Sequence, residues 1–142
     1  IALTPVGLKS LLNDAGFAWR IVVVAACYSG AYADVLDDDR TVVVAASGTD
    51  QPSFGCDGRG DPAFFGDALF SAGFAQGDSL VAAFDVARQR VAAREAERGL
   101  SASHPVMRVG ARIAPRIRHL RRFGGGNNAT ARLHGQASGR PV

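Results

Sequence analysis

The stretch IVVVAACYSG, residues 21–30, decides the fold class that the sequence predicts. It opens with four β-branched residues and continues through two alanines. This pattern is typical of a strand covered on both faces in the parallel sheet of an α/β domain. Ligands and chemistry in such folds gather just beyond the carboxyl ends of the strands. Cys27 stands at that position and is therefore the first candidate for a nucleophile.

A helix is expected before this strand and a second strand after it. Thr4 can cap the helix, Pro5 suits its first position, and Gly16 supplies a left-handed residue at its end. A second apolar run spans residues 41–46, and residues 29–40 are long enough for a short helical crossover. The sequence therefore predicts two parallel strands joined by a right-handed connection.

The chain after the second strand begins with a loop, residues 47–60, that is rich in Gly, Ser, Asp and Pro. This loop leaves the predicted sheet at the same edge as Cys27, so it can line the same cleft. Apolar residues between positions 64 and 70 predict a short helix. Asp78 is expected to cap a longer helix that ends at Gly99.

Length and composition fit one domain, because the chain has 142 residues of which 47% are hydrophobic. The first residue is Ile1, and a helix is expected with no strand before it, so we expect an N-terminally truncated piece. The absence of a signal peptide from these residues then says nothing about export. A cytoplasmic and a periplasmic or exported location both stay open. No apolar run in the sequence is long enough to span a bilayer.

The formal net charge of +3 is concentrated near the C-terminus. The arginines of this basic run are Arg108, Arg112, Arg116, Arg118, Arg121 and Arg122. Nucleic-acid binding is one hypothesis for the run. Each phosphate neutralised on B-DNA would then add about −0.9 to the slope of the logarithm of the binding constant against the logarithm of the salt concentration. The run lacks interleaved aromatic residues and a recognised motif, so we interpret it as a solvated basic face or tail and expect no nucleic-acid partner.

The two cysteines are too few for a disulfide scaffold and lack the paired spacing of a zinc site. A thiol becomes a useful nucleophile when its pKa falls toward neutrality, which a helix N-terminus or an imidazole can achieve. The helix predicted after Cys27 would point free backbone N–H groups at a developing oxyanion. The alternative is that Cys27 is a small buried hydrophobe at a strand end.

Residues 21–30 resemble the nucleophile strand of the legumain family of cysteine peptidases, bacterial members especially, which share the caspase-like fold. Further segments are similar to that family in order and spacing: residues 38–41 (DDRT), 45–46 (AA), 53–56 (SFGC), 64–67 (FFGD) and 79–84 (SLVAAF). Residues 103–105 (SHP) are similar to the family's Ser-Asn-Pro segment. The resemblance runs from about Leu3 to Gly110.

The resemblance implies a thiol peptidase in which Cys27 attacks the scissile carbonyl and its own backbone N–H helps to hold the oxyanion. The family's base is a histidine in a His-Gly pair at the end of the preceding strand, but residues 1–26 contain no histidine. His104, His119 and His134 all lie downstream, and none is assigned as the base. No metal and no organic cofactor is expected.

The resemblance also places Ser53 and Asp67 at the family's pocket for the residue before the cleaved bond. A hydroxyl and a carboxylate suit the side-chain amide of asparagine. The alternative is that Ser53 turns its loop and Asp67 caps or solvates a helix. This chain departs from plant and animal legumains at Tyr28, where they carry an acidic residue. We expect Cys56 to be a packing residue and expect no disulfide with Cys27, because it would block the nucleophile.

Other activities fit the residues less well. A cysteine phosphatase needs an arginine six positions after its thiol, where this chain has Ala33. The small-x-Cys-x-small pattern around Cys27 is also found in the nucleophile elbow of α/β-hydrolases, for which His104 would be the base. A pseudo-peptidase or binding module that kept the fold without the histidine is the non-enzyme alternative.

The sequence therefore predicts an α/β caspase-like, three-layer α/β/α sandwich with a mostly parallel sheet, present as a partial domain over residues 1–122. Residues 123–142 are expected to be a low-complexity, disordered tail. The predicted function is that of a cysteine endopeptidase that works through an acyl-enzyme on Cys27, with a peptide or protein as substrate and cleavage after Asn or Asp. Transamidation in place of hydrolysis and the oligomeric state stay open.

Overall fold

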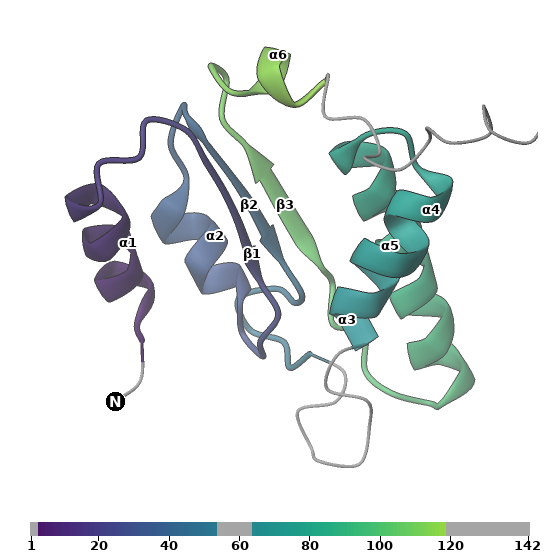
Figure 1. Cartoon of the computed structure of the whole chain (residues 1–142). Helices are drawn as coiled ribbons and strands as arrows, with labels where there is room; N and C mark the ends of the chain where they lie inside the picture. The colour runs from purple at the N-terminus through teal and green to yellow at the C-terminus, as the bar shows by residue number, and fades with distance from the viewer. Residues whose placement is uncertain (1–2, 54–63, 119–142) are drawn as a thin grey trace, which may run out of the picture.

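The computed structural model describes residues 3–53 and 64–118 and shows a sheet flanked by helices (Figure 1). Its elements in chain order are α1 (Pro5–Asp14), β1 (Arg20–Val24), α2 (Gly30–Leu36), β2 (Thr41–Ala45), α3 (Phe64–Asp67), the π-helix η1 (Ala68–Gly73), α4 (Phe74–Gln76), α5 (Leu80–Glu97), β3 (Val106–Val109) and α6 (Ala114–Ile117). None of the helices in these two ranges is both long enough and apolar enough to cross a membrane.

The sheet has the strand order β1-β2-β3. β1 and β2 pair in parallel, with Val22 opposite Val43, which confirms the predicted parallel pairing. β3 pairs antiparallel with β2, with Arg108 opposite Val43, and the sequence did not predict this strand. The prediction that the strand before Cys27 is covered on both faces is wrong, because Ile21 on β1 is 46% exposed. The fully buried strand is β2.

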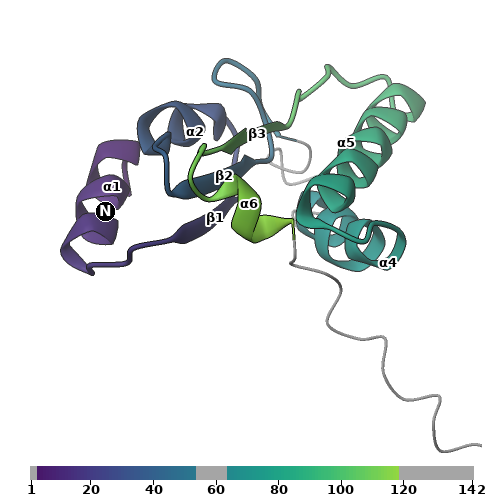
Figure 2. The same cartoon turned by 90° about the horizontal axis from the view of Figure 1, so that it is seen from above.

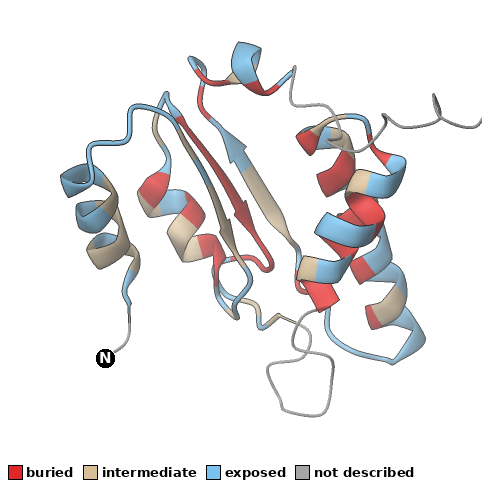
Figure 3. Ribbon diagram, viewed as in Figure 1, coloured by how far each residue is buried: buried red, intermediate tan, exposed pale blue. Residues whose placement is uncertain are grey.

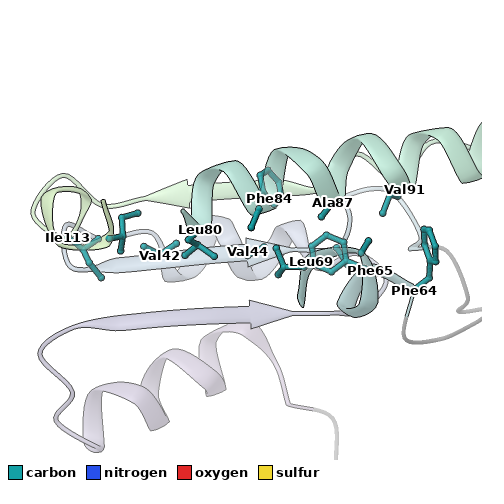
Figure 4. Close-up of a cluster of buried hydrophobic side chains, with 14 residues drawn as sticks. Val42, Val44, Phe64, Phe65, Leu69, Leu80, Phe84, Ala87, Val91 and Ile113 are labelled. Atoms are coloured by element: carbon teal, nitrogen blue, oxygen red, sulfur yellow. The ribbon is translucent and has the colours of Figure 1, made fainter. Parts of the chain in front are cut away.

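Helices cover both faces of the sheet, which gives three layers (Figure 2). Side chains alternate along a strand, so Val42 and Val44 enter the larger core with α3, η1 and α5 (Figure 4). Val43 and Ala45 point to the opposite face and pack with α1 and α2. Figure 3 shows the buried residues on β2 and on the helix faces turned toward it. The predicted α/β fold class is confirmed.

The helix ends follow the capping residues, with one correction. Thr4 caps α1, because its Oγ1 accepts a hydrogen bond of 3.1 Å from the Gly7 N–H, and Gly16 has a φ of +72°. Asp78 does not cap α5 as predicted. The cap is Ser79, whose Oγ accepts from the Ala82 N–H at 3.2 Å, since Ser79 is the residue with extended φ and ψ directly before the helix.

The predicted short helix is a longer run, in which α3, η1 and α4 follow one another from residue 64 to residue 76. It crosses α5 at close range: a Cβ on Gly73 would lie 2.4 Å from the Ala83 carbonyl oxygen. A side chain at this crossing therefore forces the two helices apart.

Gly73→Ala is expected to destabilise the protein by about 1–3 kcal/mol, because the added methyl overlaps α5 backbone. Gly66→Ala is the matched control in the same helical run, since nothing lies within 4 Å of its added Cβ. Alanine is the better helix former, so this control should be neutral or stabilising by up to about 1 kcal/mol. Thermal unfolding of the two variants measures the contrast, and equal melting temperatures would contradict the close crossing.

Candidate active site

Cys27 lies in the turn that joins β1, which ends at Val24, to α2, which begins at Gly30. The turn is tight: Tyr28 has a φ of +57°, which is uncommon for a residue other than glycine, and its side chain is 54% exposed. Cys27 is half-buried, between solvent and the sheet. The sequence thus placed the candidate nucleophile correctly beyond a strand end.

The loop after β2 lies directly against this turn. The Tyr28 N–H donates to the Gln51 carbonyl oxygen at 2.9 Å. A Cβ on Gly30 would come within 2.4 Å of the Thr49 nitrogen, so only glycine allows this approach. The predicted placement of this loop at the same edge as Cys27 is therefore confirmed for its described part, residues 47–53.

Of the residues predicted for the substrate pocket, Ser53 is in contact with the sulfur of Cys27. Its backbone N–H donates to Cys27 Sγ at 3.3 Å, and its carbonyl oxygen lies 3.6 Å from the same atom. The contact is made by the backbone of Ser53, whereas the sequence-based hypothesis concerned its hydroxyl.

Cys27 is disulfide-bonded in the structure, which contradicts the expectation of no disulfide. The chain has one other cysteine, Cys56, and it lies outside the described residues. A sulfur held in a disulfide has no thiolate to attack a carbonyl. A thiolate at Cys27 therefore requires this disulfide to be reduced first.

The backbone N–H groups around the turn correct another expectation. The Ser29 N–H donates to Ser47 Oγ, the Ala31 N–H to the Tyr28 carbonyl oxygen and the Tyr32 N–H to the Ser29 carbonyl oxygen. The start of α2 was predicted to offer free N–H groups to an oxyanion, but those of Ala31 and Tyr32 are used by the turn itself. The backbone N–H of Cys27 stays the prediction for the oxyanion donor.

Asp67 is the last residue of α3, and α3 lies at the end of the sheet where β1 and β2 finish (Figure 1). Its side chain is exposed, and no hydrogen bond or ion pair joins it to another residue of the described ranges. Its role in a substrate pocket stays a prediction.

His104 lies in the loop that leads into β3, with a φ of +52° and an exposed side chain. Its backbone lies near the β2 loop, because its carbonyl oxygen is 3.8 Å from the position of a Cβ on Gly48. β2 separates β3 from β1, the strand that leads to Cys27. No contact between His104 and Cys27 is seen in the described structure. His119 and His134 lie outside the described residues.

Two residues of the site were missed by the sequence-based prediction, Ser29 and Ser47. Both are fully buried, and they bond to each other beside Cys27. The sequence offered one signal for these serines. Each follows an apolar run that was predicted to be a strand, at the sheet edge where the reactive groups were expected. Serine is common in turns, so this signal alone does not separate a positioning role from simple turn formation.

The described part of the basic run is partly engaged within the fold. Arg108 forms an ion pair of 3.1 Å with Asp34, and the guanidinium of Arg116 lies 4.1 Å from the ring centroid of Trp19. The side chains of Arg108 and Asp34 are both 50% exposed, which fits a basic face in contact with solvent. The absence of a nucleic-acid partner stays a prediction.

Comparison with known proteins gives one match, which covers most of the chain. No curated protein and no solved structure matches it. The sequence model described as the Peptidase C13 family matches residues 2–115, a range that contains Cys27 and every element from α1 to β3. This match sets aside the α/β-hydrolase alternative built on His104. The chain belongs to the peptidase C13 family, the legumain family of cysteine peptidases.

Proposed function

We propose that Cys27 is the nucleophile of a cysteine endopeptidase. Its thiolate attacks the carbonyl carbon of the scissile peptide bond, the C–N bond breaks, and the amine leaves with a proton from an imidazolium. Water then attacks the thioester, which releases the carboxylic acid and regenerates the thiol. The observation that carries the proposal is the position of Cys27 beyond a strand end, with the Ser53 N–H on its sulfur, in a chain of this family.

The base is proposed to come from a strand that pairs along the free edge of β1. Ile21 on β1 is 46% exposed and Trp19 is 37% exposed. A hollow of about 190 Å³, lined by these two residues and Ile117 among others, borders the same edge. A further parallel strand would cover this apolar surface and would bring its own carboxyl end to the edge where Cys27 lies. A histidine at that end would complete a Cys-His pair.

The substrate pocket is proposed to use Ser53 and Asp67 for a small polar side chain before the cleaved bond. Ser53 is already in contact with Cys27 through its backbone, so its hydroxyl is within one side-chain length of the reacting centre. Asp67 is exposed and carries a carboxylate that can accept hydrogen bonds from an asparagine amide. Its charge disfavours a substrate aspartate at neutral pH, so asparagine is the expected preference.

The test is a panel of reporter peptides that differ only in the residue before the cleaved bond, assayed with the intact, reduced protein. Cleavage after Asn is expected, and Asp67→Asn should lower kcat/KM for the Asn peptide by about 10-fold or more, because a carboxylate acceptor becomes a mixed amide. Asp50→Asn is the matched control, an exposed carboxylate on the β2 loop. An equal effect of both variants would contradict the pocket.

Failure to cleave any peptide would instead favour the non-catalytic alternative, a binding module of the same fold. The presence of a histidine opposite Cys27 in the intact protein separates the two, because a module without the base retains only the fold. A structure of the intact protein that covers the β1 edge decides this point.

A further inference from the structure

Two buried serines hold the turn that carries Cys27, and the chemistry proposed above does not use them. Ser29 and Ser47 both have an exposed fraction of 0%. The Ser29 N–H donates to Ser47 Oγ at 3.1 Å, and the Ser47 N–H donates to Ser29 Oγ at 3.0 Å. The two hydroxyl oxygens are 3.2 Å apart. We call this reciprocal pair, Ser29 and Ser47, the serine clasp.

The clasp reaches both sides of Cys27. Ser47 Oγ donates to the carbonyl oxygen of Ala26, the residue before Cys27, at 3.2 Å. The same oxygen accepts from the N–H of Ser29, two residues after Cys27. One assignment of protons satisfies every bond: Ser47 donates its hydroxyl proton to Ala26, and Ser29 donates its own to Ser47. The hydroxyl of Ser47, just after β2, thus bonds the backbone on either side of the nucleophile.

Ser47 is itself anchored on both sides, so it is a fixed point for the turn. The Ala46 N–H donates to the Val24 carbonyl oxygen at 3.0 Å, which continues the pairing of β1 with β2. The Gly48 N–H donates to the Ser103 carbonyl oxygen at 2.7 Å. The Ser103 N–H in turn donates to both carboxylate oxygens of the buried Glu95 on α5, at 3.1 and 3.2 Å. The clasp is tied to the sheet and to α5.

We propose that Ser29 and Ser47 are positioning residues for Cys27, which set the sulfur and its backbone N–H in the geometry needed for acyl transfer. The inference rests on the proposed function of Cys27. Tyr28 has positive φ, so the turn needs bonds on both sides to hold it. A displacement of about 1 Å at a reacting centre costs about 10²-fold in rate, and a buried, fully bonded hydroxyl pair suits the task of preventing it.

The experiment compares Ser47→Ala with Ser103→Ala in the intact, reduced protein. Ser47→Ala is expected to lower kcat by about 10–100-fold with KM changed less than about threefold, because the turn loses its anchor without losing the pocket. Alkylation of Cys27 by iodoacetamide should stay within about twofold, because this reaction needs no oxyanion site. A general loss of the fold would instead change kcat, KM and the alkylation rate of Cys27 together.

Ser103→Ala is the matched control, since its hydroxyl is buried in the neighbouring loop and has no hydrogen-bond partner among the described residues. It should keep the wild-type kcat. Ser29→Ala leaves the bond from Ser47 to Ala26 and should lose less than Ser47→Ala, and the double variant should lose no more than Ser47→Ala. Ser29→Ala also serves if Ser47→Ala does not fold.

Amide hydrogen exchange gives a readout that needs no substrate. The N–H groups of Tyr28 and Ser29 should exchange at least about 10-fold faster in Ser47→Ala than in Ser103→Ala, because the clasp closes the turn. If a folded Ser47→Ala protein keeps the wild-type kcat or the wild-type exchange rates, the positioning role of the clasp is wrong. The proposed role of Cys27 survives that result as long as Cys27→Ala abolishes cleavage. Full cleavage by Cys27→Ala overturns the proposed function, and the positioning role with it.

Discussion

Cys27→Ala in the intact, reduced protein is expected to lower the turnover of reporter peptides by about 10⁴-fold or more. Removing a nucleophile removes the covalent route, and what remains comes from binding and oxyanion stabilisation alone. The loss should appear in kcat. The half-buried side chain contributes little packing, so thermal unfolding should change by only a few degrees. Initial rates with a fluorogenic Asn peptide measure the effect.

Cys56→Ala is the control for this prediction, because it removes the chain's other thiol. It should keep turnover within a few-fold of wild type under reducing conditions. Unchanged cleavage by Cys27→Ala, or equal loss in both variants, would mean that the sulfur of Cys27 does not attack the substrate.

The second large effect concerns oxidation. Because Cys27 is disulfide-bonded in the structure, protein prepared without reductant is expected to show almost no turnover and almost no alkylation at Cys27. A dithiol such as dithiothreitol should restore both. Its thiolate attacks the disulfide, forms a mixed disulfide and closes to its own cyclic disulfide, which leaves Cys27 as a thiol. Activity against reductant concentration, followed beside free-thiol titration, measures the recovery.

The Cys56→Ala variant tests whether the dependence on reductant comes from a disulfide between Cys27 and Cys56. If Cys56 is the partner of Cys27, the variant should react with iodoacetamide without reductant, while the wild type does not. Rapid alkylation of Cys27 in the untreated wild-type protein would contradict an oxidised resting state.

The first half of the fold could be predicted because its signals are local. Thr4 and Gly16 define α1, and the β-branched runs separated by a short helix require a parallel crossover. β3 could not be predicted in this way, because it has only four residues, of which Arg108 and Val109 are exposed. It is a strand because β2 is buried on both faces and needs a neighbour on each side, which is a property of the assembled sheet.

The candidate site divides in the same manner. Topology placed Cys27 and the β2 loop at one edge, and the structure joins them at Ser53. The prediction of free N–H groups at the start of α2 was wrong for Ala31 and Tyr32, because both donate to carbonyl oxygens of the turn itself. The serine clasp depends on distances near 3 Å between residues 18 positions apart, which no sequence pattern encodes.

The most direct test of the central claim is covalent capture. The reduced intact protein is incubated with a peptide acyloxymethyl ketone that ends in Asn, digested and mapped by mass spectrometry. One equivalent of peptidyl adduct on Cys27 is the predicted result, formed in Cys56→Ala and absent in Cys27→Ala. An adduct on another residue, or none on Cys27 when its thiol is free, would contradict the assignment of Cys27 as the nucleophile.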